Sequence, residues 1–300
     1  MDKEVLQYVG KSLYKTHILK EFKRYVVFMT RCHLHTRYMD DILDFFAASE
    51  LRQRMLQGTP SFVEQITRSF FYKNSTWAER VELVEKHILY LEERFKPKFL
   101  QKIYADNQRL RVWEDVYQDK PLGMDLWFHG GQRKEGCLSL VLNYESEELY
   151  QIMFWLGYDK AGEPSLFIGA LQGTPNGSEI IKGLTKTFYG YRTKNLIFYG
   201  IRNVAACLGA KNIYAVANEG YYAMNHIRRD RKLKTSLDDF WQECEGVQCE
   251  DKRFYKLPIE EYRKSMEELK PSKRAQHRRR FAKMDEITEA IKNSLAVYQK

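Results

Sequence analysis

Residues 166–218 set the topology of the expected sheet through three segments: LFIGALQG at 166–173, TKNLIFYGIRNVAACL at 193–208, and NIYAVAN at 212–218. The first and last segments are short apolar runs, which are typical of buried strands. The middle segment places apolar residues on one helical face, and Gly209 follows where a helix would end. These apolar residues are Ile197, Ile201, Val204 and Leu208. The order strand–loop–helix–strand predicts a crossover unit within one sheet.

The sequence upstream of this unit predicts further strands. From about residue 98, short apolar runs alternate with Gly, Asn and Asp, a pattern typical of antiparallel strands. The runs are Leu126–Phe128, Cys137–Asn143, Tyr150–Trp155 and Leu166–Leu171. Residues 173–183 have the composition of a turn. Together with the crossover unit, these runs predict an α+β domain with a mixed β-sheet over residues 97–300.

Residues 1–96 are predicted to form a helical region. Four apolar residues recur at helical spacing after a group of capping residues. The stripe consists of Val81, Val84, Ile88 and Leu91, and the candidate caps are Asn74, Ser75 and Thr76. No linker rich in Pro, Gly or Ser separates this region from residues 97–300. We therefore expect the helical N-terminal half to pack on the mixed-sheet domain.

The C-terminal part of the chain predicts two more helices. Residues 259–269 have the composition of a surface helix, and a longer helix is expected at about 272–297. The apolar seam of this last helix consists of Phe281, Met284, Ile287, Ile291 and Leu295. Its first half is densely basic, so the helix is expected to combine a buried C-terminal half with a charged N-terminal half.

The net charge of the chain is concentrated in two short segments. The 300 residues include 49 Lys or Arg and 40 Asp or Glu, which gives a net charge of +9. Residues 270–283 contain seven basic residues and no acidic residue, and residues 228–234 contain five basic residues and one Asp. The remaining 37 basic and 39 acidic residues sum to −2. This distribution predicts two basic patches on a nearly neutral body.

Several functional classes lack their usual sequence signals. The start, MDKEVLQYVGKSLYK, has no basic-then-apolar signal, and no apolar run approaches the roughly 20 residues that span a bilayer. The five cysteines are scattered, which argues against a secreted disulfide framework. Cys32 and His35 share a helical face without further visible ligands, so we expect no metal site. The GxSxG, HExxH, P-loop and GxGxxG motifs are absent. We expect a cytoplasmic protein without a transmembrane segment.

Residues 166–218 also resemble a known protein family. Residues 185–196, TKTFYGYRTKNL, with the flanking segments 166–173 and 212–218, resemble the VirK/YbjX family of Gram-negative bacteria. The segments LDDFW at 237–241 and SKRAQHRRRF at 272–281 agree with this resemblance. Thr193 stands where the family usually has proline, and Tyr221–Tyr222 where a histidine is common. The family is linked to virulence, envelope stress and resistance to membrane-active peptides without an established reaction. The resemblance thus implies a role in envelope adaptation, and the basic patches allow a peripheral position at the inner membrane.

The crossover unit is similar in order to the acyl-CoA-binding core of GNAT acyltransferases. In that core, backbone N–H groups at a helix N-terminus bind the cofactor pyrophosphate. The corresponding loop here, residues 189–194, has one glycine, Gly190, where GNAT loops usually carry two. We call it the Gly190 loop. The candidate ligand-binding residues are Gln172, Gly173, Lys186, Gly190, Arg192, Lys194 and Asn218, and His226 is a weak candidate for a catalytic base. A fold relative without a cofactor site, and a His226 that belongs to a solvated basic face, remain the alternatives.

The basic start of the last helix is unusual because cations there face the positive end of the helix dipole. The candidate anion-binding residues are Arg228, Arg229, Arg231, Lys273, Arg274, Arg278, Arg279 and Arg280. Anionic lipid or a lipopolysaccharide precursor is the favoured partner, and nucleic acid is less favoured because no RNP, zinc-finger or clear helix-turn-helix signature is present. A solvated face without a partner is the simple alternative.

Two functions therefore remain open. The first is a GNAT-like acyltransferase, or a binding protein, that acts on an anionic envelope component, with acyl-CoA as the cofactor of the enzyme. The second is a non-enzymatic module that binds phosphate groups of lipid headgroups or nucleic acid through the C-terminal basic patches.

Overall fold

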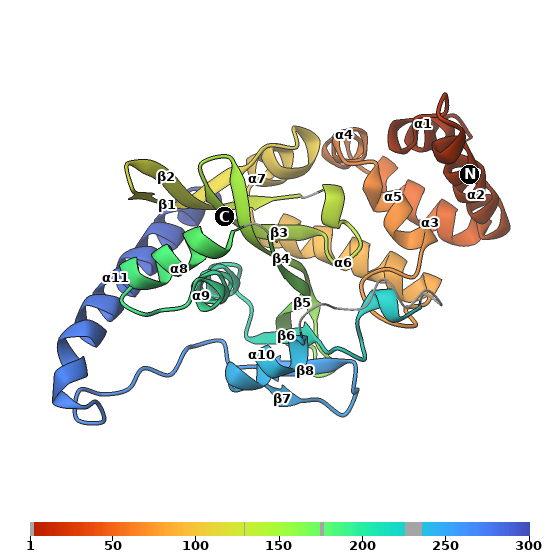
Figure 1. Ribbon diagram of the computed structural model, residues 1–300. Coiled ribbons are helices and arrows are strands. Elements are labelled where there is room, and N and C mark those ends of the chain that lie inside the picture. The colour runs from red at the N-terminus through yellow and green to blue at the C-terminus, as the bar shows by residue number, and fades with distance from the viewer. Residues whose placement is uncertain (1–2, 129, 175–176, 226–235) are drawn as a thin grey trace.

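The computed structural model describes residues 3–128, 130–174, 177–225 and 236–300, and it confirms the α+β class. In these ranges, eight strands form one mixed sheet with the order β1-β2-β3-β4-β5-β6-β8-β7. The strands are β1 (Leu110–Tyr117), β2 (Lys120–Trp127), β3 (Leu138–Tyr144), β4 (Glu147–Tyr158), β5 (Pro164–Gly173), β6 (Asn212–Val216), β7 (Val247–Gln248) and β8 (Phe254–Leu257). Figure 1 shows the N-terminal helices at one end of the molecule, the sheet in the middle and the C-terminal helix at the other end.

The predicted crossover unit is present between β5 and β6. These two strands pair in parallel from Ser165↔Asn212 to Ile168↔Ala215, and β6 then pairs antiparallel with β8. The connection contains α8 (Ser178–Thr187) and α9 (Thr193–Cys207), and α9 ends two residues before Gly209 as predicted. The expectation of a turn throughout 173–183 is wrong after residue 177. Leu184 is buried and the hydroxyl of Thr193 donates to the carbonyl of Ile181, so packing against α9 stabilises a helix there.

The helical region contains seven helices within the described ranges, and α6 joins it to the sheet. The helices are α1 (Lys3–Leu13), α2 (Leu19–Leu34), α3 (Thr36–Ala47), α4 (Glu50–Gly58), α5 (Ser61–Thr67), α6 (Trp77–Arg94) and α7 (Pro97–Leu100). The predicted cap Thr76 forms a capping box with Glu79 at the start of α6. The imidazole of His87 on α6 accepts from the backbone N–H of Leu156 on β4 at 3.0 Å and bonds the hydroxyl of Tyr104 at 2.7 Å. Burial lowers the pKa of His87 to about 3, so this joint is uncharged at neutral pH.

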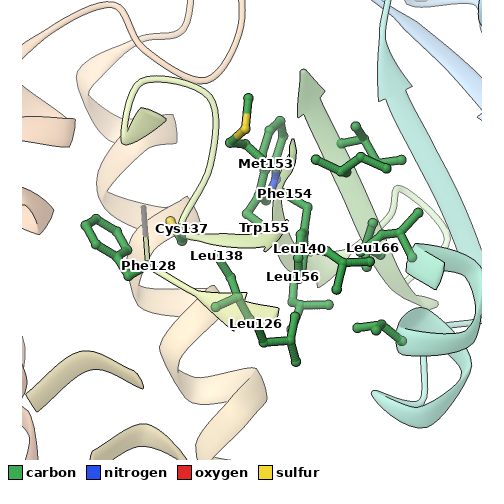
Figure 2. Packing of buried hydrophobic residues seen from close by; sticks show 14 of the residues in the cluster. Leu126, Phe128, Cys137, Leu138, Leu140, Met153, Phe154, Trp155, Leu156 and Leu166 are labelled. Atoms are coloured by element: carbon green, nitrogen blue, oxygen red, sulfur yellow. The ribbon is translucent and has the colours of Figure 1, made fainter. Parts of the chain in front are cut away.

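The sheet core is apolar across the neighbouring strands. Figure 2 shows Leu126, Leu140, Leu156 and Leu166, one from each of β2 to β5, close together. All four are fully buried, and β2 pairs Leu126 with Leu140 while β4 pairs Leu156 with Leu166. Burying a leucine side chain contributes roughly 1.5–3 kcal/mol. This layer therefore holds the crossover unit rigidly against the antiparallel strands.

The C-terminal helix α11 (Pro271–Ala296) confirms the predicted last helix. Met284, Ile287, Ile291 and Leu295 are buried, and the helix packs on α9 and β1. Lys283 forms an ion pair with Asp115 of β1 at 2.9 Å. Figure 1 shows that the N-terminal part of α11 extends beyond the sheet.

The predicted surface helix at 259–269 is wrong, because no helix forms in this segment. Its side chains make separate contacts with the body instead. Glu261 accepts from the hydroxyl of Tyr191, and Arg263 pairs with Asp285 of α11 at 2.6 Å. A short 3-10 helix lies elsewhere in the chain, at Tyr222–Asn225. No helix in the described ranges is both long enough and apolar enough to cross a bilayer.

Candidate functional site

Three of the predicted anion-binding residues form an exposed basic surface on α11, which we call the outer α11 face: Lys273, Arg278 and Arg279. The side chains of these three residues make no hydrogen bond or ion pair with a described residue. The first turn of α11 contains no acidic residue, and Pro271 occupies the start of the helix. The outer α11 face therefore presents uncompensated positive charge to solvent.

The other two predicted cations of α11 bind the protein itself. The guanidinium of Arg280 donates twice to the backbone carbonyl of Tyr189, at 2.7 and 3.3 Å. The side-chain amide of Gln276 donates to the same carbonyl at 2.8 Å. Arg274 donates to the carbonyl of Leu269 at 3.2 Å. Arg280 and Arg274 thus hold α11 and its preceding segment in place, because their N–H groups find carbonyl oxygens within reach.

The Gly190 loop, where the sequence predicts a cofactor phosphate, is packed against α11. Gly190 has φ +78°, and a side chain at this position would lie 3.0 Å from Nε2 of Gln276. Tyr191 is buried beside the loop and donates its hydroxyl to Glu261. A phosphate at this loop would have to displace Gln276 and Arg280 from the carbonyl of Tyr189. Acyl-CoA binding at this loop stays a prediction.

The cations predicted beside Gly190 also have partners in the protein. Arg192 forms an ion pair with Glu243 and donates to Asn195 at 3.2 Å. The ammonium of Lys194 lies 3.9 Å from the ring centroid of Phe240, and burial lowers its pKa. Both side chains therefore stabilise the start of α9.

The remaining predicted ligand residues do not gather in one place. Lys186 is exposed on α8, and Gly173 lies opposite Tyr150 at the end of β5. Asn218 accepts from the backbone N–H of Leu237 at 2.7 Å and thereby holds the start of α10 (Leu237–Glu243). The predicted residues His226, Arg228, Arg229 and Arg231 lie outside the described residues.

A buried carboxyl lies where β5 and β6 part. The parallel pairing ends at Ile168↔Ala215, while β5 continues beside β4 as far as Gly173. The backbone of Glu135 lies directly against Gly169, the next residue of β5, where even a Cβ would lie only 1.8 Å from the carbonyl oxygen of Glu135. This close approach needs a glycine, and it fixes Glu135 at the point of divergence.

The polar contacts of Glu135 leave one oxygen without a partner. Its Oε1 accepts from the hydroxyl of Tyr221 at 3.1 Å and from the side-chain amide of Gln172 at 3.3 Å. Its Oε2 is buried and has no hydrogen-bond partner among the described residues. Glu135 is only 2% exposed, and burial raises its pKa to about 7. We call these three residues the Glu135 junction: Glu135, Gln172 and Tyr221.

The Glu135 junction was only partly visible in the sequence. Gln172 was a candidate from its place at the end of a strand, and Tyr221 stood out as a departure from the family pattern. Glu135 itself follows a glycine-rich turn in an ordinary charged stretch, GGQRKEG at 130–136. No spacing or motif marks it, because its burial depends on β5 and on the segment after β6.

Comparisons with known proteins support the family resemblance. The profile of a family described as "Protein of unknown function (DUF535)" matches residues 17–293. The chain is 32% identical over 241 residues to "Uncharacterized protein YbjX" of Escherichia coli strain K12, covering 78% of this chain and 72% of that protein. It is 23% identical over 259 residues to an "Uncharacterized protein" of Haemophilus influenzae, covering 85% of this chain and 84% of that protein. No solved structure matches the chain.

Proposed function

The chain belongs to the VirK/YbjX family, described as DUF535, and within this family we propose that it binds the phosphate groups of anionic lipid headgroups through the outer α11 face. The observation that carries this proposal is the exposure of Lys273, Arg278 and Arg279 without a partner. A lipopolysaccharide precursor presents the same phosphate chemistry. The corresponding location is a peripheral one at the inner membrane.

Electrostatics favours a partner for these cations. A cation in the first turn of a helix, as Lys273 is here, costs roughly 0.3–1 kcal/mol at low salt, whereas Arg278 and Arg279 lie beyond the first turn and are outside this effect. Near an anionic bilayer, each Lys or Arg gains about 1 kcal/mol. Binding of an anionic surface is therefore favourable for all three residues, and only for Lys273 does it reverse an unfavourable contribution. The ion pair of Lys283 with Asp115 and the buried seam hold the helix from its other end.

The test is sedimentation with vesicles of phosphatidylglycerol and phosphatidylcholine, with pure phosphatidylcholine as the neutral reference. The variant Lys273→Glu/Arg278→Glu/Arg279→Glu should lower the partition coefficient at least roughly 100-fold at low salt. A matched control, Lys160→Glu/Lys252→Glu/Lys292→Glu, makes the same change in net charge at exposed lysines outside the outer α11 face, with Lys292 in the C-terminal half of α11. If both triple variants lose the same affinity, the outer α11 face is not the binding site.

A nucleic acid partner is tested with the same two variants. A short RNA or DNA duplex replaces the vesicles, and affinity is measured at several salt concentrations because phosphate binding releases counterions. If the α11 variant loses nucleic acid binding but not vesicle binding, the phosphate-binding surface stands and the lipid headgroup is rejected as its partner.

A second candidate function is acyl transfer from acyl-CoA, and the divergence of β5 and β6 favours it. In support of this candidate, the crossover unit is similar in order to the core of GNAT acyltransferases, β5 and β6 pair in parallel, and the buried carboxyl of Glu135 lies where the two strands part. Thermal unfolding with and without acyl-CoA tests this function. An unchanged Tm at saturating acyl-CoA would count against the enzyme and would leave the proposal for α11 untouched.

A further inference from the structure

Helix α2 leaves an apolar surface open to solvent, which we call the α2 face. It consists of Leu19, Phe22, Val26, Val27 and Leu34. These side chains are between 44% and 74% exposed. Their helical spacing places them on one side of α2, while Phe28 and Cys32 on the opposite side are buried in the core. Figure 1 shows α2 at the end of the molecule that lies farthest from α11.

The α2 face lies within a third basic segment of the chain. Residues 11–37 contain seven Lys or Arg and a single acidic residue, Glu21. Glu21 already pairs with Arg24 at 2.5 Å. Lys20 and Lys23 are exposed on the same helix as the apolar side chains. The net charge outside residues 228–234 and 270–283 is close to zero because acidic residues elsewhere offset the positive charge of this segment.

The combination of apolar and cationic side chains restricts what can cover this face. A second copy of the chain, related by a twofold axis, would bring this net-positive face against an identical one, and like charges across an interface are unfavourable. An anionic bilayer surface satisfies both properties. Apolar side chains enter the boundary of the acyl chains, while lysine ammonium groups stay at the headgroups. The helix of 16 residues is about 24 Å long and can lie flat in this boundary.

We propose that α2 is an interfacial membrane-binding helix that inserts the α2 face into the surface of an anionic bilayer. The inference does not rest on the proposed function of the outer α11 face, which carries charge without an exposed apolar surface. The two sites differ in the forces that they use. The outer α11 face depends on headgroup charge, whereas the α2 face also depends on contact with acyl chains.

The experiment uses the full chain with vesicles of phosphatidylglycerol and phosphatidylcholine. The variant Phe22→Ser/Val26→Ser/Val27→Ser changes only partly exposed side chains, so the fold should persist, as circular dichroism checks. We expect the partition coefficient to fall roughly 10- to 100-fold because three apolar side chains no longer enter the bilayer. The matched control is Val116→Ser/Val247→Ser/Val297→Ser, at positions between 54% and 70% exposed, and it should bind within about twofold of the unchanged protein.

A second measurement separates the two proposals. In 0.5 M salt, where charge is screened, the loss caused by the α2 serine variant should persist, while the loss caused by the α11 charge variant should shrink. A serine variant that partitions like the unchanged protein would overturn the proposal for α2 and leave the one for α11 standing. Sedimentation equilibrium provides the other contrary outcome: a dimer of the unchanged protein that the serine variant abolishes would identify a second copy as the occupant.

Discussion

On the outer α11 face, the charged groups of Lys273, Arg278 and Arg279 lie in solvent with no partner among the described residues, whereas the carboxyl of Glu135 lies in the interior, where one of its oxygens also lacks a described partner. The first arrangement costs little because water solvates each cation. The second is costly in its ionised form, and the group responds by holding its proton. Exposure or burial therefore sets what each group can do: the outer α11 face presents positive charge to solvent, and the carboxyl of Glu135 can exchange a proton near neutral pH.

The largest expected effect is the pH dependence of stability at Glu135. Its pKa in the folded protein is about 7, raised from the ordinary 4.5, so the folded state binds the proton more tightly than the unfolded chain does. The stabilisation is complete below pH 4.5 and is lost as the pH rises through 7, by roughly 2–4 kcal/mol. Urea unfolding between pH 5 and 8 measures this loss. The variant Glu135→Gln should lack it, and parallel curves for the two proteins would contradict the assignment.

A smaller effect is expected inside α11, where Arg280 differs from its exposed neighbours. The substitution Arg280→Ala removes two donors from the carbonyl of Tyr189 and should destabilise the protein by about 1–2 kcal/mol. Arg279→Ala is the matched control, because this side chain has no partner, and its effect should stay within about 0.5 kcal/mol. Equal urea midpoints for the two variants would show that Arg280 is as free as Arg279.

The hydrogen bond from Tyr221 to Glu135 can be tested by removing the donor hydroxyl. Tyr221→Phe removes a hydrogen bond to Oε1 of Glu135 and should cost about 1 kcal/mol. Because this donor favours the ionised carboxylate, its loss should also raise the pKa of Glu135 further. The double variant Glu135→Gln/Tyr221→Phe completes a double-mutant cycle, which measures the interaction between the two side chains. Additive effects of the two substitutions would mean that the residues do not interact.

The smallest expected effect on stability belongs to the outer α11 face. Replacing Lys273, Arg278 and Arg279 by alanine should change the free energy of unfolding by less than about 0.5 kcal/mol per position. At low salt Lys273→Ala alone should be slightly stabilising, because a cation in the first turn of a helix is unfavourable. Urea midpoints at 0.02 and 0.5 M salt measure this difference. A marked loss of stability would place these side chains in a structural role and weaken the comparison with Glu135.

Sequence patterns predicted the elements whose signals are local. The stripe that includes Val84 and Ile88 marks α6, and the order of short runs marks the crossover unit and most strands. The prediction of a helix at 259–269 is wrong because side chains of this segment bind distant residues. Glu261 accepts from Tyr191, and Arg263 pairs with Asp285, and local composition reveals neither contact. The start of α8 was missed for a related reason, since packing against α9 outweighs the turn residues before it.

The candidate sites, too, were predictable only where their sequence signal is local. The cations of α11 are recognisable in the sequence because they cluster within residues 273–280. The basic segment at 11–37 is equally recognisable, but acidic residues elsewhere offset it in the sum over the rest of the chain. The exposure of its apolar residues was not readable, because an amphipathic helix shows a polar and an apolar side but not which side meets the core. Phe28 faces the core and Phe22 faces solvent on the same helix.

Local sequence patterns are sufficient to predict the helical region, the crossover unit, the family and the position of the positive charge on α11, because motifs, periodicity and clustering of charge are properties of neighbouring residues. Tertiary structure alone decided which charges have partners. Arg280 reaches a carbonyl 91 positions away, and the contact between Glu135 and Tyr221 spans 86 positions. Burial and pairing depend on such distant contacts, so only the folded chain separates the three cations of the outer α11 face from Arg280 and places a buried carboxyl where β5 and β6 part.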